Sequence, residues 1–397
     1  VVKKQKAIAR QEKIPSVEQY RLKPNKMQVG FIESLQKIRQ AGEQRALLIS
    51  ATGTGKTYAS AFALREADPK RVLFLVHREQ IAKQAIESFR RVFGRTKTFG
   101  LLSGNSKRYD EEYLFATMQM MAKEETLSRY QKTEFDVIII DEVHRAGASS
   151  YQRIMGYFEP QFWLGMTASP ERTDGFDIYH LFDHNIAYEI RLQQALEEDL
   201  LCPFHYFGIT EMEVDGEVFD DTIGMRNFSY LICDERVEYI LEKAKYYGYS
   251  GDRVKGLMFC SRKEEAKELS RKFNEKGYQT AFLCGEHSQE ERERCIERLT
   301  SDDSTDYLDY IFTIDIFNEG VDIPEINQVI MLRPTESPVV FIQQLGRGLR
   351  KADGKKYVVI LDFIVNYMNN FMITVALSGD RSYNKDNMRK YVSGGTK

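Results

Sequence analysis

Short apolar runs alternate along the chain with longer stretches of helical pattern, first between residues 45 and 168. Most of these short runs are continuously apolar, as expected for strands that helices cover on both faces. Such alternation predicts right-handed βαβ units and a parallel sheet. The predicted strands are 45–50, 71–77, 112–117, 135–141 and 161–167.

The same rhythm restarts after about residue 235 and predicts a second parallel sheet. Two of the intervening helices carry start signals, because Ser261 with Glu264 and Ser288 with Glu291 fit the spacing of a capping box. The predicted strands of this second part are 256–260, 280–284, 310–314, 328–332 and 357–361.

The two rhythms predict two α/β domains, each with a parallel sheet. We assign residues 24–200 to the first, 236–366 to the second and 201–235, with its stretch rich in Asp, Glu and Gly, to the connection. Residues 1–23 carry several Lys and Arg and few large apolar groups, so we interpret them as a linker or arm. The chain starts without methionine, and we expect 367–397 to be the start of a truncated C-terminal region of a longer protein.

Composition narrows the class of protein. A hydrophobic share of 42% and a charged share of 29% fit a globular domain pair, and no apolar run is long enough for a membrane span. The net charge of −3 means that any nucleic-acid surface must be local. The five cysteines form no C-x-x-C pair and indicate reduced thiols, which predicts a cytoplasmic protein.

The segment Ser50–Thr57 lies between an apolar strand pattern and a helix pattern. A strand, a glycine-rich turn and a helix start form a phosphate cradle, because backbone N–H groups and the helix dipole face an anion. Lys56 can reach the β- and γ-phosphates and Thr57 can ligate Mg²⁺. The pattern G-x-x-x-x-G-K-[ST] would place glycine where the chain has Ser50. The predicted nucleotide-binding residues here are Thr52, Gly53, Thr54, Gly55, Lys56 and Thr57.

A second cluster, Asp141-Glu-Val-His144, ends the apolar strand 135–141. Ligands of open α/β sheets bind at the carboxyl ends of parallel strands. Asp141 can therefore hold Mg²⁺, and Glu142 is placed to orient and deprotonate an attacking water. An exposed Asp-Glu pair would be the better interpretation in isolation, but the cradle upstream favours the catalytic one.

Together these two segments resemble the superfamily 2 helicases and translocases of the DEAD/DEAH-like class. The family cradle commonly reads A-x-x-G-x-G-K-T, so Ser50 marks a subtype. The resemblance covers roughly residues 22–365. It implies two tandem RecA-like P-loop domains, with ATP and Mg²⁺ as cofactors and the ATP site in the cleft between the domains. The motors of type I and type III restriction enzymes (ResIII-like) and excision-repair translocases look most similar.

Further roles follow from this resemblance. In the first domain, Gln28 looks like the adenine-reading residue, Arg78 and Thr117 belong to motifs that contact the nucleic-acid strand, and Thr167-Ala-Ser169 resembles the motif that couples hydrolysis to domain movement. In the second domain, Met258–Arg262 resembles a backbone-contacting motif, and Asn318–Pro324 resembles a motif near the nucleotide. The implied residues are Gln28, Gly320 and Asp322 for ATP, Arg78, Thr117, Ser261 and Thr313 for nucleic acid, and His144, Thr167 and Ser169 for coupling. Ile314-Asp315 stands where the family often has Thr-Asp, which puts the contact at Thr313 in doubt.

Ser337-Pro338 predicts a helix from there to about residue 351. On it, Gln343, Arg347 and Arg350 share one face. A solvated polar face is the simpler interpretation for a lone helix. In a two-domain phosphate-binding protein, the arginine pair instead predicts a γ-phosphate sensor supplied by the second domain.

The sequence thus predicts an ATP-dependent nucleic-acid motor that moves on or unwinds DNA, contacted mostly through phosphates. Two alternatives stay open, namely an ATP-gated nucleic-acid switch that does not translocate and an RNA helicase, which only the resemblance to DNA motors disfavours. We expect no membrane partner, and further domains such as a nuclease in the full-length protein.

Overall fold

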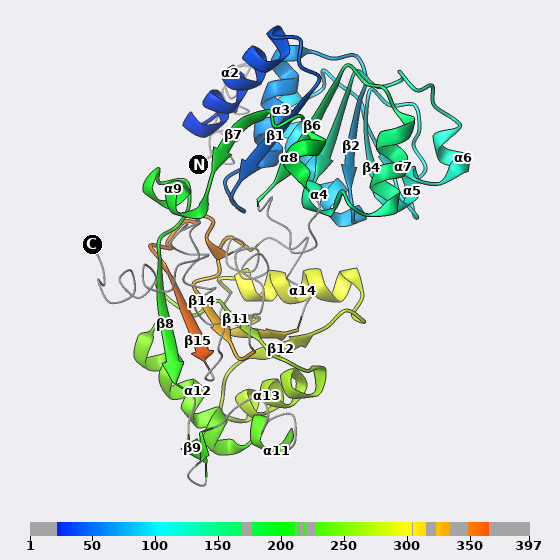
Figure 1. Ribbon diagram of the computed structural model, residues 1–397. Coiled ribbons are helices and arrows are strands. Elements are labelled where there is room, and N and C mark those ends of the chain that lie inside the picture. Colours follow the sequence, from blue (N-terminus) through cyan, green and yellow to red (C-terminus); the bar gives the residue numbers. More distant parts are fainter. Residues whose placement is uncertain are drawn as a thin grey trace, which may run out of the picture. The chain divides into compact units, whose positions relative to one another are not determined.

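The computed structural model describes residues 22–168, 177–210, 213–214, 217–218, 228–303, 305–314, 323–333 and 348–364. Apart from the turn at 51–54, the chain divides between Glu189 and Ile190 into two compact units. Each unit is built around one β-sheet (Figure 1). Among the described residues, no helix is both long and apolar enough to cross a membrane.

The first unit contains a seven-stranded sheet in the order β3-β4-β2-β5-β6-β1-β7. Every strand pair with a recorded register is parallel, as predicted. The strands are β1 (Arg45–Ser50), β2 (Val72–Val76), β3 (Phe99–Leu102), β4 (Tyr113–Thr117), β5 (Val137–Asp141), β6 (Phe162–Thr167) and β7 (Ile186–Ile190). The helices are α2 (Lys26–Gln40), α3 (Lys56–Ala67), α4 (Glu79–Phe93), α5 (Met118–Met121), α6 (Glu124–Leu127), η1 (Val143–Arg145), α7 (Ser149–Tyr157) and α8 (Ile178–Leu181).

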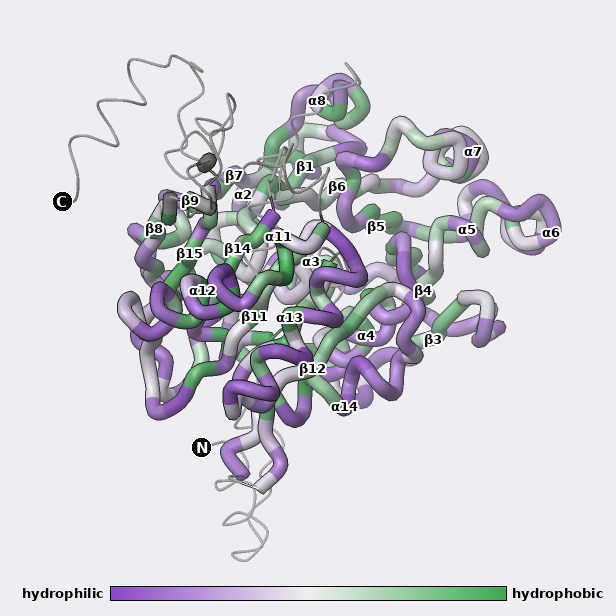
Figure 2. Tube along the Cα trace, turned by 90° about the horizontal axis from the view of Figure 1, so that it is seen from below, coloured by the Kyte–Doolittle hydropathy of each residue, from purple (hydrophilic) through white to green (hydrophobic). Residues whose placement is uncertain are grey.

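Both faces of this first sheet are buried, which explains the continuous apolar runs. One hydrophobic cluster joins the sheet to α2, α3 and α4, and a second joins its other face to α5, α6, α7 and α8. In Figure 2 the strands are accordingly hydrophobic along most of their length. The polar residues at the carboxyl edge of the sheet therefore follow strands that are packed on both faces.

The second unit contains a six-stranded parallel sheet in the order β12-β13-β11-β14-β15-β8. Its strands are β8 (Phe204–Thr210), β11 (Gly256–Phe259), β12 (Thr280–Leu283), β13 (Tyr310–Thr313), β14 (Gln328–Met331) and β15 (Val358–Ile364), with a hairpin of β9 (Glu213–Val214) and β10 (Glu217–Val218). The helices are α9 (Leu192–Glu197), α11 (Phe228–Leu231), α12 (Asp234–Tyr247), α13 (Lys263–Glu275) and α14 (Gln289–Thr300). One face of the sheet packs on α12 and α13.

The predicted fold class, two α/β domains with parallel sheets, is confirmed. The structure adds strands that the pattern did not predict, namely β3, β7, β8, β9 and β10. β8 lies in the segment assigned to the connection, yet it pairs with β15 along Phe204–Thr210. The second sheet therefore includes a strand that precedes α11, α12, α13 and α14 in the sequence.

The two predicted capping boxes have different outcomes. Ser288 caps α14 together with Glu291, as predicted. At α13 the prediction is wrong, because the N-cap is Arg262 and the backbone N of Ser261 donates to Glu265 Oε2 at 2.9 Å. Glu264 is exposed, whereas Glu265 is buried and forms an ion pair with the buried Arg236.

Candidate active site

The turn between β1 and α3 adopts a conformation that glycine allows. Gly53 has φ 91° and Gly55, the N-cap of α3, has φ 93°. A side chain in this left-handed region is strained. A Cβ atom on Gly55 would also lie 2.9 Å from Gln28 Nε2, closer than such contacts occur. The backbone of the predicted cradle is therefore set by these two glycines.

Polar groups of the cradle are held by short contacts within the turn. Thr54 Oγ1 donates to the Ala51 carbonyl at 2.7 Å, and Lys56 Nζ donates to the Ser50 carbonyl at 2.9 Å. The Thr52 hydroxyl is buried and has no hydrogen-bond partner within the described part of the chain. An unsatisfied buried hydroxyl is costly, and it lies beside the positive end of a twelve-residue helix. This arrangement fits an anion with several acceptor oxygens.

Gln28 connects the start of α2 to this turn. Its Oε1 accepts from the Asn25 backbone N at 2.9 Å, and its Nε2 donates to the Gly55 carbonyl at 3.3 Å. The residue is buried, so its amide has a defined orientation. An amide oxygen can accept twice and an amide nitrogen can donate twice. Each polar atom thus retains capacity for one further bond, as two-point contact with adenine requires.

Asp141 is the last residue of β5 and Glu142 follows it. The sheet order separates β5 from β1 by β6 alone. Burial raises the pKa of Asp141 to about 6, and the neighbouring Glu142 carboxylate adds to this effect. Burial also acts to raise the pKa of Glu142, but the hydrogen bond from His144 and the charge of Lys56 outweigh it and lower that pKa to about 2. The lysine of the cradle therefore interacts electrostatically with both carboxylates, which belong to the same site.

Glu142 has an unusual backbone conformation for a residue with a side chain, with φ 51° and ψ 48°. Such a left-handed residue costs on the order of 1–3 kcal/mol and persists where its surroundings fix it. The turn starts η1, buries Val143 and brings His144 back toward the carboxylate. His144 Nδ1 lies 3.2 Å from Glu142 Oε2 and 3.2 Å from Thr167 Oγ1. One imidazole thus links the carboxylate to the end of β6.

His77 is a residue that the sequence analysis did not single out. It follows β2, whose register with β5 brings it beside the Asp141-Glu142 turn. Burial, with the positive charges of Arg145 and Arg78, lowers the pKa of His77 to about 4, so that its imidazole is neutral at pH 7. In the sequence it follows the last apolar residue of a strand and lies directly before Arg78, within the segment 76–81 that resembles a strand-contacting motif.

The four residues predicted to contact nucleic acid lie at the carboxyl edges of the two sheets. In the first unit, Arg78 is exposed at the start of α4 and Thr117 is buried at the end of β4. In the second unit, Ser261 is exposed after β11, and Thr313 ends β13, the next strand. The Thr313 hydroxyl is fully buried and has no hydrogen-bond partner among the described residues. The side chains that solvent reaches are therefore those of Arg78 and Ser261.

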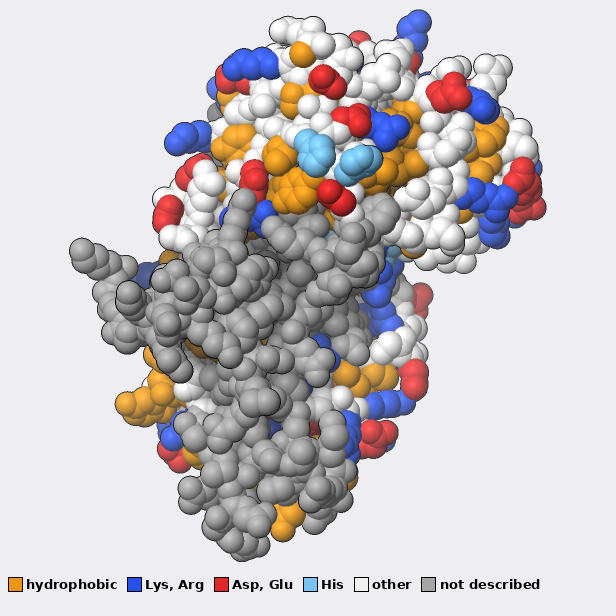
Figure 3. Space-filling view, viewed as in Figure 1, with side chains coloured by type: hydrophobic (Ala, Val, Ile, Leu, Met, Phe, Trp, Pro, Cys, Tyr) orange, Lys and Arg blue, Asp and Glu red, His pale blue; other side chains and the backbone are white. Residues whose placement is uncertain are grey.

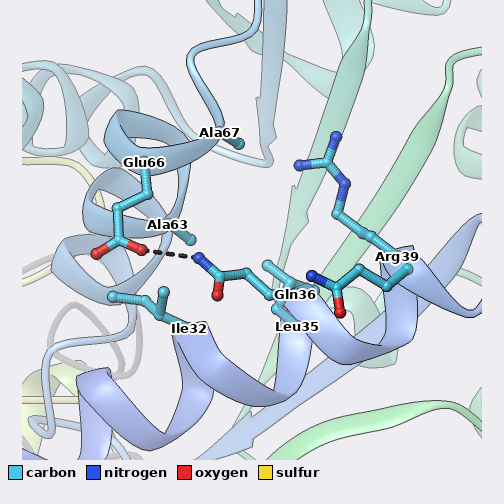
Figure 4. A pocket seen from close by; sticks show the side chains of 8 residues that line it. Ile32, Leu35, Gln36, Arg39, Ala63, Glu66 and Ala67 are labelled. Carbon is cyan, nitrogen blue, oxygen red and sulfur yellow. Dashed lines mark hydrogen bonds between the residues drawn. The ribbon is translucent and has the colours of Figure 1, made fainter.

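A groove of about 500 Å³ on the first unit lies apart from this site (Figure 4). It runs between α2 and α3, where Gln36 Nε2 donates to Glu66 Oε2 at 2.9 Å. Glu66 and Ala67 belong to the last turn of α3, whereas the cradle is at the first turn. With a rise of about 1.5 Å per residue, the two ends are roughly 15 Å apart. This groove is therefore not the nucleotide site.

Comparison with known proteins identifies both parts of the chain. Residues 21–172 match the family model "Type III restriction enzyme, res subunit", and residues 237–352 match "Helicase conserved C-terminal domain". The chain belongs to the superfamily 2 helicase family. The resemblance predicted from the cradle and the DEVH segment is thereby confirmed.

Relatives in this helicase family include yeast and bacterial proteins. "Putative ATP-dependent helicase IRC3" of Saccharomyces cerevisiae is 26% identical over 82% of this chain and 49% of its own length. "Type I restriction enzyme EcoAI endonuclease subunit" of Escherichia coli is 26% identical over 81% of this chain and 44% of its own. The chain thus spans about half the length of these curated relatives.

Two solved structures have a similar fold. "The fragment structure of a putative HsdR subunit of a type I restriction enzyme from Vibrio vulnificus YJ016" superposes with a TM-score of 0.66 and 26% identity, covering 90% of this chain and 68% of that one. The structure of Saccharomyces cerevisiae Dbp5 bound to RNA and ADP BeF3 superposes at 0.62 with 16% identity, covering 94% and 93%, and shows the fold alone.

Several predicted site residues lie outside the described ranges, namely Ser169, Gly320, Asp322, Gln343 and Arg347. Of the predicted arginine helix, the described part includes Leu349, which is buried and whose carbonyl accepts from the Cys202 backbone N at 2.7 Å, and Arg350, which is partly buried. The roles of these residues stay predictions.

Proposed function

We propose that this helicase-family chain is an ATP-dependent nucleic-acid motor that hydrolyses ATP with Mg²⁺ and moves along or unwinds DNA. The observation that supports this most is the common location of the phosphate cradle and the Asp141-Glu142 pair at one edge of one sheet. The relatives named as an ATP-dependent helicase and as a restriction-enzyme subunit favour the same activity.

In this proposal, ATP binds with its phosphates at the start of α3. The backbone N–H groups after Gly53 and Gly55 surround the phosphate oxygens, and the Thr52 hydroxyl gains the partner that it lacks. Lys56 exchanges the Ser50 carbonyl for the β- and γ-phosphates. Gln28 contacts the adenine with the remaining capacity of its amide.

Thr57 and Asp141 are the residues that would hold Mg²⁺. Their hydroxyl and carboxylate oxygens are ligands of the kind that this cation prefers. When bound, Mg²⁺ neutralises charge on the phosphate groups during transfer. A carboxyl group with a raised pKa, such as that of Asp141, is also one that a nearby cation would ionise.

Glu142 orients the attacking water and accepts its proton. The low pKa of this carboxyl keeps it ionised at neutral pH, and His144 Nδ1, 3.2 Å from its Oε2, holds its orientation. Arg347 and Arg350, with Gln343, would complete the site from the second domain as the γ-phosphate sensor. Arginine residues of this kind raise phosphoryl-transfer rates by roughly 10³–10⁵-fold.

Nucleic acid would lie along the carboxyl edge of each sheet, contacted by the exposed side chains of Arg78 in the first unit and Ser261 in the second. A contact at Thr117 or Thr313, which are buried, would require the end of its strand to become exposed on binding. Contacts of this type are made to phosphates, so binding should show little sequence preference and should weaken strongly with salt. Because the chain spans half of its curated relatives, we extend the proposal to further domains of a longer protein, such as a nuclease.

The test is ATP hydrolysis with single-stranded DNA, duplex DNA or RNA. Strong stimulation by DNA is the expected result, and stimulation by RNA alone would replace DNA with RNA as the substrate. A triplex-displacement assay separates a motor from an ATP-gated switch, because only a translocating protein displaces the third strand. Hydrolysis without displacement would exclude translocation.

A further inference from the structure

The second unit contains a buried ion pair that the catalytic scheme does not use. Arg236 on α12 is 1% exposed and Glu265 on α13 is 0% exposed, with Arg236 Nη1 2.9 Å from Glu265 Oε1. Removing two charges from water costs several kcal/mol per ion, and the attraction between them often does no more than offset this cost. A pair of this kind calls for a role besides stability.

Both partners make a second bond to the backbone. Arg236 Nη1 also donates to the Leu231 carbonyl at the end of α11, at 2.8 Å. The other oxygen of Glu265, Oε2, accepts from the Ser261 backbone N at 2.9 Å. The pair therefore joins α11, α12 and α13 to the turn that follows β11. That turn presents the exposed residue Ser261 at the carboxyl edge of the sheet.

Joining α12 to α13 does not require a buried charge. Two ion pairs at the surface already connect these helices, Lys272 to Asp234 at 2.6 Å and Lys276 to Glu238 at 2.9 Å. The helices also share a hydrophobic core with the sheet. Beyond joining these helices, the buried pair supplies the bond to the Leu231 carbonyl and an acceptor for the Ser261 N–H. Of these two contacts, only the second reaches the carboxyl edge of the sheet, where a carboxylate oriented by an arginine gives the Ser261 amide a fixed acceptor.

We propose that Arg236 and Glu265 are positioning residues for the nucleic-acid contact at Ser261. This inference rests on the proposed function. Arg236 holds the Glu265 carboxylate, the carboxylate holds the Ser261 amide, and the hydroxyl of Ser261 is thereby presented in one orientation. Without the acceptor the turn must be ordered on binding. The free energy needed to order the turn is similar to that for immobilising one or two side chains. The dissociation constant for DNA should therefore rise about three- to tenfold.

The test compares double variants that differ in the acceptor for the Ser261 amide. Arg236→Met with Glu265→Leu removes the charges and the acceptor, and apolar replacement of a buried pair is often neutral for stability. Arg236→Met with Glu265→Gln removes the same charges but retains an amide oxygen. Glu238→Leu with Lys276→Met is the matched control, since it removes an ion pair between the same helices and leaves Ser261 untouched.

Binding of a labelled single-stranded oligodeoxynucleotide and DNA-stimulated ATPase are measured on each variant. The Met/Leu variant should bind DNA about three- to tenfold more weakly, with a raised DNA concentration for half-maximal stimulation and an unchanged ATPase rate at saturating DNA. The Met/Gln variant and the control should resemble the unaltered protein. Equal DNA affinity of all three double variants would overturn the proposal.

Two further measurements distinguish a wrong positioning role from a wrong DNA contact and from a variant that does not fold. Ser261→Ala tests the contact itself: if it weakens DNA binding while the Met/Leu variant does not, the positioning role is wrong. If Ser261→Ala has no effect on a protein that binds DNA, both the contact and this inference are wrong while the motor function stands. Should the Met/Leu variant not fold, hydrogen exchange on the unaltered protein decides, because a Ser261 amide that exchanges as fast as exposed loops would overturn the proposal.

Discussion

His144 Nδ1 and Thr167 Oγ1 lie 3.2 Å apart at the ends of the neighbouring strands β5 and β6. The same imidazole nitrogen is 3.2 Å from Glu142 Oε2, so the histidine lies between the Glu142 carboxylate and the strand end that leads to the predicted coupling motif. Thr167 is fully buried. Glu142 and the end of β6 are therefore connected through a single side chain.

Replacing Thr167 with valine should uncouple nucleic-acid binding from hydrolysis. Valine retains the shape of threonine but removes the hydroxyl that meets His144. The loss of one hydrogen bond in a buried site, about 1–2 kcal/mol, predicts roughly a five- to thirtyfold loss of DNA stimulation. Steady-state ATPase with and without DNA measures this, and ATP affinity should stay unchanged. Thr167→Ser retains the hydroxyl and serves as control, so an equal loss in both variants would contradict the coupling role.

Replacing Gly55 with alanine should abolish tight ATP binding. The residue has φ 93°, which costs about 1–2 kcal/mol for a side chain. Its Cβ would also press on Gln28. We expect at least a tenfold loss in ATP affinity by isothermal titration. Gly42→Ala is the control, because Gly42 has φ 87° with open space around a Cβ. Equal ATP affinity of the two variants would show that the cradle geometry does not matter.

The stability of the second unit should depend on pH through Asp362. Burial raises the pKa of this carboxyl from its ordinary value of 3.8 to about 6, although Tyr206 donates to its Oδ2 at 2.6 Å. Because the pKa is higher in the folded state, the protonated form favours folding. Its contribution is fully present below about pH 4 and is lost as the pH rises through about 6. The change is on the order of 3 kcal/mol.

Asp362→Asn removes the charge and retains an oxygen acceptor for Tyr206. We expect this variant to be more stable than the unaltered protein at pH 8 and similar to it at pH 4. Hydrogen exchange of peptides from β8 and β15, which pair at this residue, reports the effect locally. Tyr206→Phe is the control. It retains the Asp362 carboxyl and removes its hydrogen-bond donor, so hydrogen exchange of the β8 and β15 peptides should not become slower at pH 8. A pH dependence that persists in Asp362→Asn would assign it to another group.

The sequence predicted the sheets well because most of their strands are buried on both faces and thus continuously apolar. β1 and β14 illustrate this, for their observed limits differ from the predicted ones by one residue at most. β8 was not predicted, because Phe204-His-Tyr-Phe-Gly-Ile-Thr210 mixes exposed and buried residues at the edge of its sheet. β3 is four residues long and contains a glycine, which weakens any strand pattern.

The parts of the site that consist of sequence motifs were predictable. The parts that depend on contacts between residues far apart in the sequence were not. The sequence indicated the cradle and the Asp141-Glu142 pair, because the residue types alone imply phosphate and metal chemistry. It could not show the left-handed backbone of Glu142. The bond between Ser261 and Glu265 was likewise hidden, because Glu265 is buried beside Arg236, which lies 29 residues away from it along the chain.

Neither composition nor visible surface predicts where nucleic acid binds. The net charge is −3, and on the face of the first unit seen in Figure 3 the Lys and Arg side chains are interspersed with Asp and Glu. The prediction that Arg78 and Ser261 contact nucleic acid depends on family motifs instead. A steep loss of DNA affinity with rising salt is nevertheless expected, since contacts to phosphates release counterions. Affinity that is independent of salt would exclude the proposed mode of binding.

Glu142 is the proposed base that activates water at an ATP site that nucleic acid controls. The most direct measurement is the DNA-stimulated ATPase rate of Glu142→Gln beside its ATP affinity. Glutamine retains the shape of the side chain but cannot accept the proton, so turnover should fall by about 10²–10⁴-fold while ATP still binds. A Glu142→Gln protein that hydrolyses ATP at the rate of the unaltered protein would contradict the account.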